Sequence, residues 1–167
     1  MPKQEKRKIP TQFDDFISPT VNTYSLETTI AEKLDAILDL MEFSSRMKDY
    51  YDIYYLANKF DFDGATLTKA LKKTFENRGH SFTVEQFEQV MAFAENDAMQ
   101  KKWKAFCRKI DTKTDDFNTV LKTIKEFLIE PYKAAVADIK CTKIWLANNN
   151  SWIQGGNDND ENSICRT

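Results

Sequence analysis

Several charged residues stand where helical periodicity would place core side chains. In the stretch 23–60, TYSLETTIAEKLDAILDLMEFSSRMKDYYDIYYLANKF, Lys33 projects at the edge of an apolar helical face. Arg46 and Asp49 project into the apolar face of the helix that follows, and Asp52 lies one turn beyond Asp49. A carboxylate in apolar surroundings is costly unless a cation or a hydrogen-bond donor pairs with it. The pattern therefore predicts either structural ion pairs or a site for a charged ligand.

Two helices have to position these residues. We expect them at 25–41 and 45–60, packed side by side and joined by a short polar link at 43–45. Ser25 is a suitable N-cap, and Glu27 lies in the first turn, where a carboxylate suits the helix dipole. Glu27 also projects near the middle of the apolar arc. The opposite face of the first helix is expected to be solvated, and it carries Thr28, Glu32, Asp35 and Asp39.

Each charged residue also has a plain structural interpretation. Lys33 could extend its ammonium group past apolar neighbours into water, and Glu27 could complete the helix start. An ion pair between Arg46 and Asp49 would satisfy the buried carboxylate without any ligand. The spacing alone leaves the structural and the functional interpretation open.

The two segments SLETTIAEKLDAIL and SSRMKDYYDIYYL resemble the third and fourth motifs of the AbiEii/AbiGii nucleotidyltransferase toxin family. In that family an A-E-K helix precedes the pattern R-x-K-D-x-x-D, and Lys33 falls on the motif lysine. The resemblance implies that Lys33 binds nucleotide phosphate and that Asp49 and Asp52 are catalytic and organise the reaction centre. It also implies a toxin–antitoxin or abortive-infection role. The supporting residues are Glu27, Arg46 and Lys48.

The family's metal-binding elements are not found ahead of the A-E-K helix in this sequence. Related nucleotidyltransferases use a glycine turn and a D-x-D pair that holds Mg²⁺, whereas no glycine occurs in the 24 residues before Ser25. The segment 61–63 spells D-x-D, but it follows the second motif and is expected to form a turn and an N-cap. The chain is therefore interpreted as the C-terminal half of such an enzyme, inactive and without a cofactor when alone. Mg²⁺ and a nucleoside triphosphate are expected only with a complete catalytic half.

Two non-catalytic interpretations stay open beside this one. The chain could be a helical interaction module, or a truncated remnant that folds without a present role. The partners considered are the missing catalytic half, an antitoxin or a second copy of the chain, with RNA engaged only indirectly. An exposed face where the catalytic half would pack favours docking of this kind.

Composition limits the remaining function classes. The formal net charge of -2 argues against a general nucleic-acid-binding surface, and local basic clusters are interpreted as solvated helix faces more readily than as RNA contacts. No apolar run approaches a membrane span, and no secretory signal opens the chain. Cys107, Cys141 and Cys165 lack metal-ligand spacing, and His80 does not complete a zinc set with them. The expected compartment is the cytoplasm.

The fold is expected to be mainly α, a bundle of about six or seven helices. An extended arm at 1–24, a helical domain at 25–153 and a disordered tail at 154–167 make up the expected organisation, with strand-like patterning confined to the arm. Later helices are signalled by a cap at Asp63 and by a capping box at 83–86, and another helix is expected to be interrupted at Pro131. Trp145, Leu146, Trp152 and Ile153 are expected to pack back onto the bundle.

Overall fold

The computed structural model describes residues 25–41, 46–111 and 113–155. The expected arm at 1–24, the link at 43–45 and nearly all of the expected tail lie outside the described residues. Within them the fold is mainly helical, as predicted. The elements, in chain order, are α1 (Leu26–Leu40), α2 (Met47–Lys59), β1 (Phe62–Asp63), α3 (Gly64–Asn77), α4 (Val84–Met91), the 3-10 turn η3 (Ala92–Glu95), α5 (Asp97–Ile110), α6 (Phe117–Ala137), β2 (Lys143–Leu146) and β3 (Ser151–Gln154).

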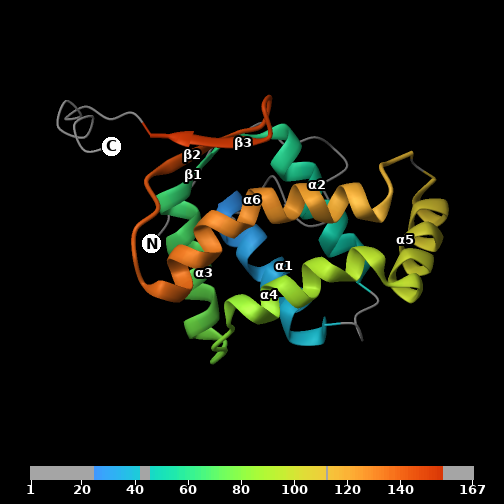
Figure 1. Cartoon of the computed structure of the whole chain (residues 1–167), viewed down its shortest axis with the longest axis horizontal. Coiled ribbons are helices and arrows are strands. Elements are labelled where there is room, and N and C mark those ends of the chain that lie inside the picture. Colours follow the sequence, from blue (N-terminus) through green and yellow to red (C-terminus); the bar gives the residue numbers. More distant parts are fainter. Residues whose placement is uncertain (1–24, 42–45, 112, 156–167) are drawn as a thin grey trace, which may run out of the picture.

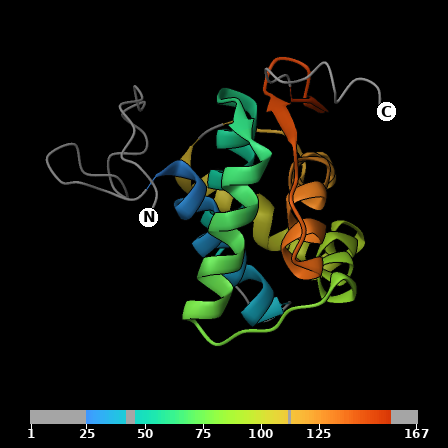
Figure 2. The same ribbon diagram turned by 90° about the vertical axis from the view of Figure 1, so that its left-hand side faces the viewer.

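Helix α1 buries one face in the core. It packs against α2 and α3, and the long helix α6 packs against α2 and α3 in turn (Figures 1 and 2). Ile30, Ala31 and Leu34 of α1 are fully buried, as the spacing of apolar residues along this helix predicts. Helix α5 stands at the end of the molecule opposite the strands (Figure 1). No described helix is both long enough and apolar enough to cross a membrane.

Helix starts follow local sequence signals. The Ser25 side chain accepts a hydrogen bond from the Thr28 N–H, and the Asp63 side chain accepts one from the Thr66 N–H. The capping box at the start of α4 forms as predicted, with reciprocal hydrogen bonds between Thr83 and Gln86. These bonds satisfy N–H groups that have no partner inside the helix. They fix where α1, α3 and α4 begin.

Helix α6 runs unbroken through Pro131, so the expected interruption is wrong. A proline in a helix interior cannot donate to the carbonyl four residues earlier, which here belongs to Phe127. The Trp152 indole of β3 supplies the missing donor, because its Nε1–H lies 3.1 Å from the Phe127 carbonyl oxygen and 2.9 Å from that of Glu126. A distant strand thus satisfies the carbonyl that proline leaves without its helical partner.

The expectation that strands are confined to the N-terminal arm is also wrong. Three short antiparallel strands form a sheet in the order β1-β2-β3, with Trp145 opposite both Phe62 and Trp152. Trp145 is fully buried against Phe127, and its indole donates a hydrogen bond of 2.8 Å to the Ala57 carbonyl. The expected packing onto the bundle is therefore confirmed for Trp145, through a β-hairpin.

Candidate functional site: a lysine between two buried aspartates

The predicted proximity of Lys33, Asp49 and Asp52 is confirmed. The Lys33 ammonium nitrogen lies 2.9 Å from Asp52 Oδ2 and 3.3 Å from Asp49 Oδ1. Helix α1 supplies the lysine and α2 supplies both aspartates, which stand three residues apart on the side of α2 that faces α1. One cation therefore bridges two carboxylates across the contact between these helices.

Both aspartates are buried, whereas their outer cations face solvent. The Asp49 and Asp52 side chains are 3% and 1% exposed, and the Lys33 side chain is 15% exposed. Arg46 places its Nε 2.9 Å from Asp49 Oδ2, and Lys48 places its Nζ 3.1 Å from Asp52 Oδ2. The side chains of Arg46 and Lys48 are 58% and 45% exposed. We call these five residues, Lys33, Arg46, Lys48, Asp49 and Asp52, the charged cluster.

Burial shifts the pKa of one carboxyl of the charged cluster. Desolvation raises the pKa of the Asp52 carboxyl above its ordinary value, although Lys33 and Lys48 act in the opposite direction. The neighbouring Tyr50 is fully buried, and burial followed by the Asp49 charge raises the pKa of its phenol. Asp52 is therefore a stronger base than a solvated aspartate, which suits it to accept a proton.

Glu27, expected to support the site, is buried at 2% exposure in the first turn of α1. The sequence position predicted this, because Glu27 projects into the apolar arc of that helix. Its supporting role stays a prediction.

The described residues do not fit a magnesium site. Among them no group of three or more His, Cys, Asp or Glu residues could hold a metal ion. Asp49 and Asp52 are engaged by cations, and Mg²⁺ needs several oxygen ligands in near-octahedral geometry. The D-x-D at 61–63 is committed to structure, because Asp61 accepts a bond from the Ala147 N–H and Asp63 caps α3. The predicted cap is thus confirmed, whereas the predicted turn is wrong, because Phe62 and Asp63 form the strand β1.

A second buried carboxylate was missed by the sequence analysis. Asp35, expected on a solvated face, is 1% exposed, and its carboxylate oxygens lie 2.9 and 3.1 Å from His80 Nδ1. Arg78 contributes a nitrogen 3.8 Å from the same carboxylate. The prediction failed because the partners of Asp35 come from the end of α3 and the segment after it, more than 40 residues away in the chain. Asp39 is exposed, as expected.

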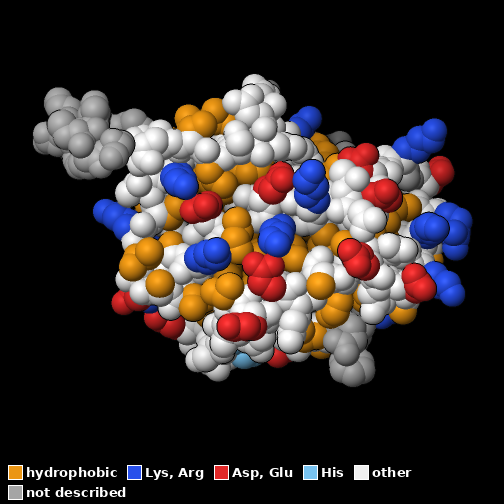
Figure 3. Space-filling view, in the orientation of Figure 1, with side chains coloured by type: hydrophobic (Ala, Val, Ile, Leu, Met, Phe, Trp, Pro, Cys, Tyr) orange, Lys and Arg blue, Asp and Glu red, His pale blue; other side chains and the backbone are white. Residues whose placement is uncertain are grey.

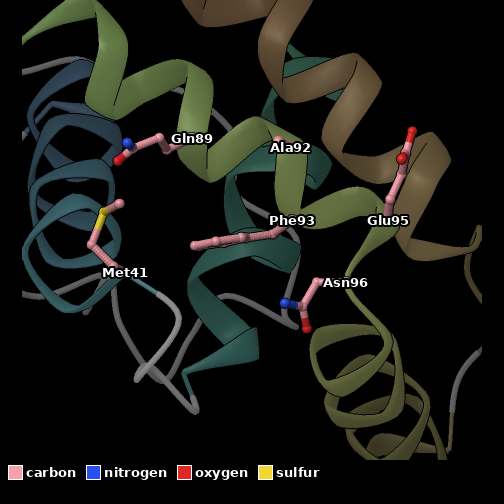
Figure 4. A pocket seen from close by; sticks show the side chains of 6 residues that line it. All are labelled: Met41, Gln89, Ala92, Phe93, Glu95 and Asn96. Atoms are coloured by element: carbon pink, nitrogen blue, oxygen red, sulfur yellow. The ribbon is translucent and has the colours of Figure 1, made fainter.

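One hollow of the described surface lies away from the charged cluster. It has a volume of about 550 Å³, and its lining residues are Met41, Gln89, Ala92, Phe93, Glu95 and Asn96 (Figure 4). None of them belongs to the charged cluster, and the polar side chain of Asn96 already caps α5. The hollow therefore offers no built set of phosphate ligands.

The comparison with protein families agrees with the residue pattern. The family described as "Nucleotidyl transferase AbiEii toxin, Type IV TA system" matches residues 1–128. The chain belongs to this family. The matched region contains all five residues of the charged cluster and extends into α6, but it ends before β2 and β3. No curated protein and no solved structure matches the chain.

Membership of the AbiEii toxin family gives the chain a place among toxin–antitoxin nucleotidyltransferases. A family of this kind implies an antitoxin as a partner. Family membership does not assign roles to individual residues. The geometry of the charged cluster is the basis for the roles proposed below.

Proposed function

We propose that this chain provides the helical part of an AbiEii-type nucleotidyltransferase toxin, with Lys33, Asp49 and Asp52 at its reaction centre. One observation carries the proposal: a single lysine amine is shared by two buried aspartates, at 2.9 and 3.3 Å. Burying three charges between two helices has a high desolvation cost, and packed apolar residues would hold the helices together as well. A functional demand explains why charged residues occupy this position.

Lys33 is assigned to the nucleotide phosphates. Its ammonium group is a compact charge with three donors, suited to phosphate oxygens. Arg46 and Lys48 stand at the solvent side of the same cluster, where they add positive charge for an incoming triphosphate. Positioning and charge neutralisation supply most of the catalysis in phosphoryl-transfer chemistry, so these cations act as clamps.

Asp49 and Asp52 are assigned to organising the reaction centre. Asp49 holds Lys33 and Arg46 in place, and Asp52 holds Lys33 and Lys48. The raised pKa of Asp52 suits it to take the proton of an acceptor hydroxyl as the nucleotide is transferred. The hydroxyl oxygen would then bond to the α-phosphorus while the bond to pyrophosphate breaks.

Mg²⁺ is assigned to a separate catalytic half. The described carboxylates do not fit the metal, and no step is assigned to Mg²⁺ here. We therefore expect this chain alone to bind nucleoside triphosphate weakly and to transfer little of it.

The test is a nucleotide-transfer assay on total RNA with α-³²P-labelled nucleoside triphosphates and Mg²⁺. The purified chain is assayed alone and with a family polypeptide that carries a glycine turn and D-x-D but ends before its own A-E-K helix. We expect labelling only in the combined reaction, and a loss of at least about 100-fold in the Lys33→Arg and Asp49→Asn variants. Full labelling by both variants would overturn the site assignment.

The matched control is Asp35→Asn, which alters an equally buried carboxylate outside the charged cluster. An equal loss of labelling in this variant would show that weakened folding, and not the change in the charged cluster, lowers the activity. Labelling by the chain alone, abolished by Lys33→Arg, would show instead that no separate catalytic half is needed.

A second candidate function is a non-catalytic docking module that binds an antitoxin or a second copy of the chain. It is favoured by the mutual neutralisation of the cluster's charges, which a purely structural role also explains. Sedimentation equilibrium of the purified chain tests the homodimer. A dimer whose formation is unaffected by Lys33→Arg, together with no labelling in either reaction, would favour this function.

A further inference from the structure

We propose that the outer face of α5 binds the phosphate backbone of a nucleic acid strand. Helix α5 carries five cations and one acidic residue, a formal charge of +4, although the whole chain has a formal net charge of -2. Figure 3 shows Lys and Arg side chains gathered at the end of the molecule that α5 occupies, with acidic side chains around them. Composition alone conceals this concentration of positive charge.

The basic side chains lie on one side of the helix and the apolar ones on the other. Met99 and Trp103 are 1% and 2% exposed, and they face the bundle. The outer face is exposed throughout, and it carries Lys101, Lys104, Arg108 and Lys109. Residues 101, 104 and 108 follow one another at helical spacing, over about 10 Å at 1.5 Å per residue. Such a row can contact several successive phosphates of one strand.

None of these four cations forms an ion pair with another residue in the described part of the chain. Asp116 caps α6, whereas Asp97 and Asp111 are exposed at the two ends of α5 and offset part of its positive charge. Asp115 accepts the hydrogen bond of the Tyr54 hydroxyl. The helix dipole accounts for Arg108 and Lys109 in the last turn, but not for Lys101 and Lys104.

Nucleic acid fits this face better than a membrane or an acidic protein. An amphipathic helix binds membranes by burying its apolar face in lipid, and Met99 and Trp103 of that face of α5 are already buried in the bundle. Protein interfaces are built around apolar and aromatic centres and are poor in lysine. The outer face of α5 has a row of cations instead, with Ala98 and Ala105 between them.

Helix α5 packs against α2, the helix that carries both aspartates of the charged cluster. Phe106 of α5 packs on Tyr51 of α2 with ring centroids 5.8 Å apart. Tyr51 precedes Asp52 in α2, so α5 lies against the helix segment that carries the aspartates of the cluster. Binding of a nucleic acid backbone to α5 does not require nucleotide transfer. Only the role of the bound nucleic acid as nucleotide acceptor rests on the proposed function.

The experiment measures binding of the full chain to a fluorescein-labelled 20-nucleotide single-stranded RNA by anisotropy, between 50 and 200 mM salt and without nucleotide. Contacts to four phosphates predict a slope of log K against log salt near -3, which corresponds to a loss of roughly 50-fold over this range. The variant Lys101→Gln/Lys104→Gln/Arg108→Gln is expected to bind more than about tenfold more weakly at 50 mM, with a slope near -1. All three side chains are exposed, so the melting temperature should not change.

The matched control removes three positive charges elsewhere, through Lys69→Gln/Lys73→Gln/Lys133→Gln on α3 and α6, whose side chains are also exposed. It should bind RNA nearly as well as the wild type. An equal loss in both variants, or unchanged binding by the α5 variant, would overturn the proposal. So would a wild-type chain that ignores RNA but binds phosphatidylserine vesicles or polyglutamate. Because no nucleotide is present, failure here is distinct from failure of the transfer assay.

Discussion

Lys33 holds two buried negative charges, and no other cation in the described part of the chain is buried beside them to the same degree. Arg46 and Lys48 reach Asp49 and Asp52 from the solvent side, where water screens them and their contacts are correspondingly weaker. The buried part of the cluster therefore depends on one lysine. Replacing this residue should affect both the stability of the fold and the proposed nucleotide transfer. The choice of substitution separates the two effects.

Replacing Lys33 with methionine keeps the length of the side chain and removes its charge. Asp49 and Asp52 then remain buried at 3% and 1% exposure without their shared cation. We expect the free energy of unfolding to fall by about 3–5 kcal/mol, the usual cost of breaking a buried ion pair on one side. Urea denaturation followed by circular dichroism measures the change. The exposed Lys73→Met serves as control, and a loss no larger than that of this control would contradict the prediction.

The raised pKa of Asp52 predicts a pH dependence of stability. Its ordinary value is 3.8, and burial lifts the folded-state pKa above it. The folded chain then binds more protons than the unfolded chain in this window, so the contribution of Asp52 to stability is lost as pH rises. The unfolding free energy of the wild type minus that of Asp52→Asn should therefore decrease from pH 4 to pH 7. A difference that stays constant or increases would show that the pKa is not raised.

At the scale of elements, the unbroken helix α6 depends on a strand far away in the sequence. Pro131 leaves the Phe127 carbonyl without its usual helical donor, and the Trp152 indole donates to it at 3.1 Å. The hairpin and the helix therefore stabilise each other. This coupling can be measured as an interaction free energy.

A double-mutant cycle between Trp152→Phe and Pro131→Ala measures that coupling. Phenylalanine keeps the ring but removes the indole donor, at an expected cost of about 1–2 kcal/mol in the wild-type helix. In the Pro131→Ala background the alanine N–H can donate to Phe127, so the same substitution should cost less. Thermal unfolding of the four proteins gives the interaction free energy. Additive effects would contradict this account of how the helix passes Pro131.

The local elements could be predicted from the sequence, whereas several long-range contacts could not. Ser25, Asp63 and the Thr83–Gln86 box signal their helix starts within four residues, so short segments contain the whole cause. The charged cluster was found because its two segments match known motifs. Asp35 was misplaced because its partner His80 is remote in the chain and helical spacing alone assigns the residue to a polar face.

The strands β2 and β3 were missed for a related reason. Each has only four residues, and Trp145 and Trp152 predict burial without saying whether a helix or a strand achieves it. The pairing of Phe62 with Trp145 joins segments more than 80 residues apart. Likewise, α6 continues past Pro131 only because Trp152 provides a donor.

At the scale of the whole molecule, the hairpin completes a core that the family-matched region leaves open. The match ends at residue 128, yet Trp145 is fully buried and hydrogen-bonded to Ala57 of α2. We expect Trp145→Ala to lower the unfolding free energy by about 3–5 kcal/mol, through lost burial and an unpaired carbonyl. Urea denaturation tests this, with Ile153→Ala on the exposed side of the hairpin as the control. Equal, small effects would show that the hairpin is an appendage.

The charged cluster lies between α1 and α2, and it is the site at which we propose nucleotide transfer takes place. The most direct test replaces its buried charges together, in the variant Lys33→Met/Asp49→Asn/Asp52→Asn. Removing all three charges avoids an uncompensated buried ion, so this variant should unfold within about 2 kcal/mol of the wild type. In the nucleotide-transfer assay with the catalytic half supplied, we predict that it is folded and at least about 100-fold less active. A folded triple variant that labels RNA at the wild-type rate would show that the cluster only holds α1 and α2 together.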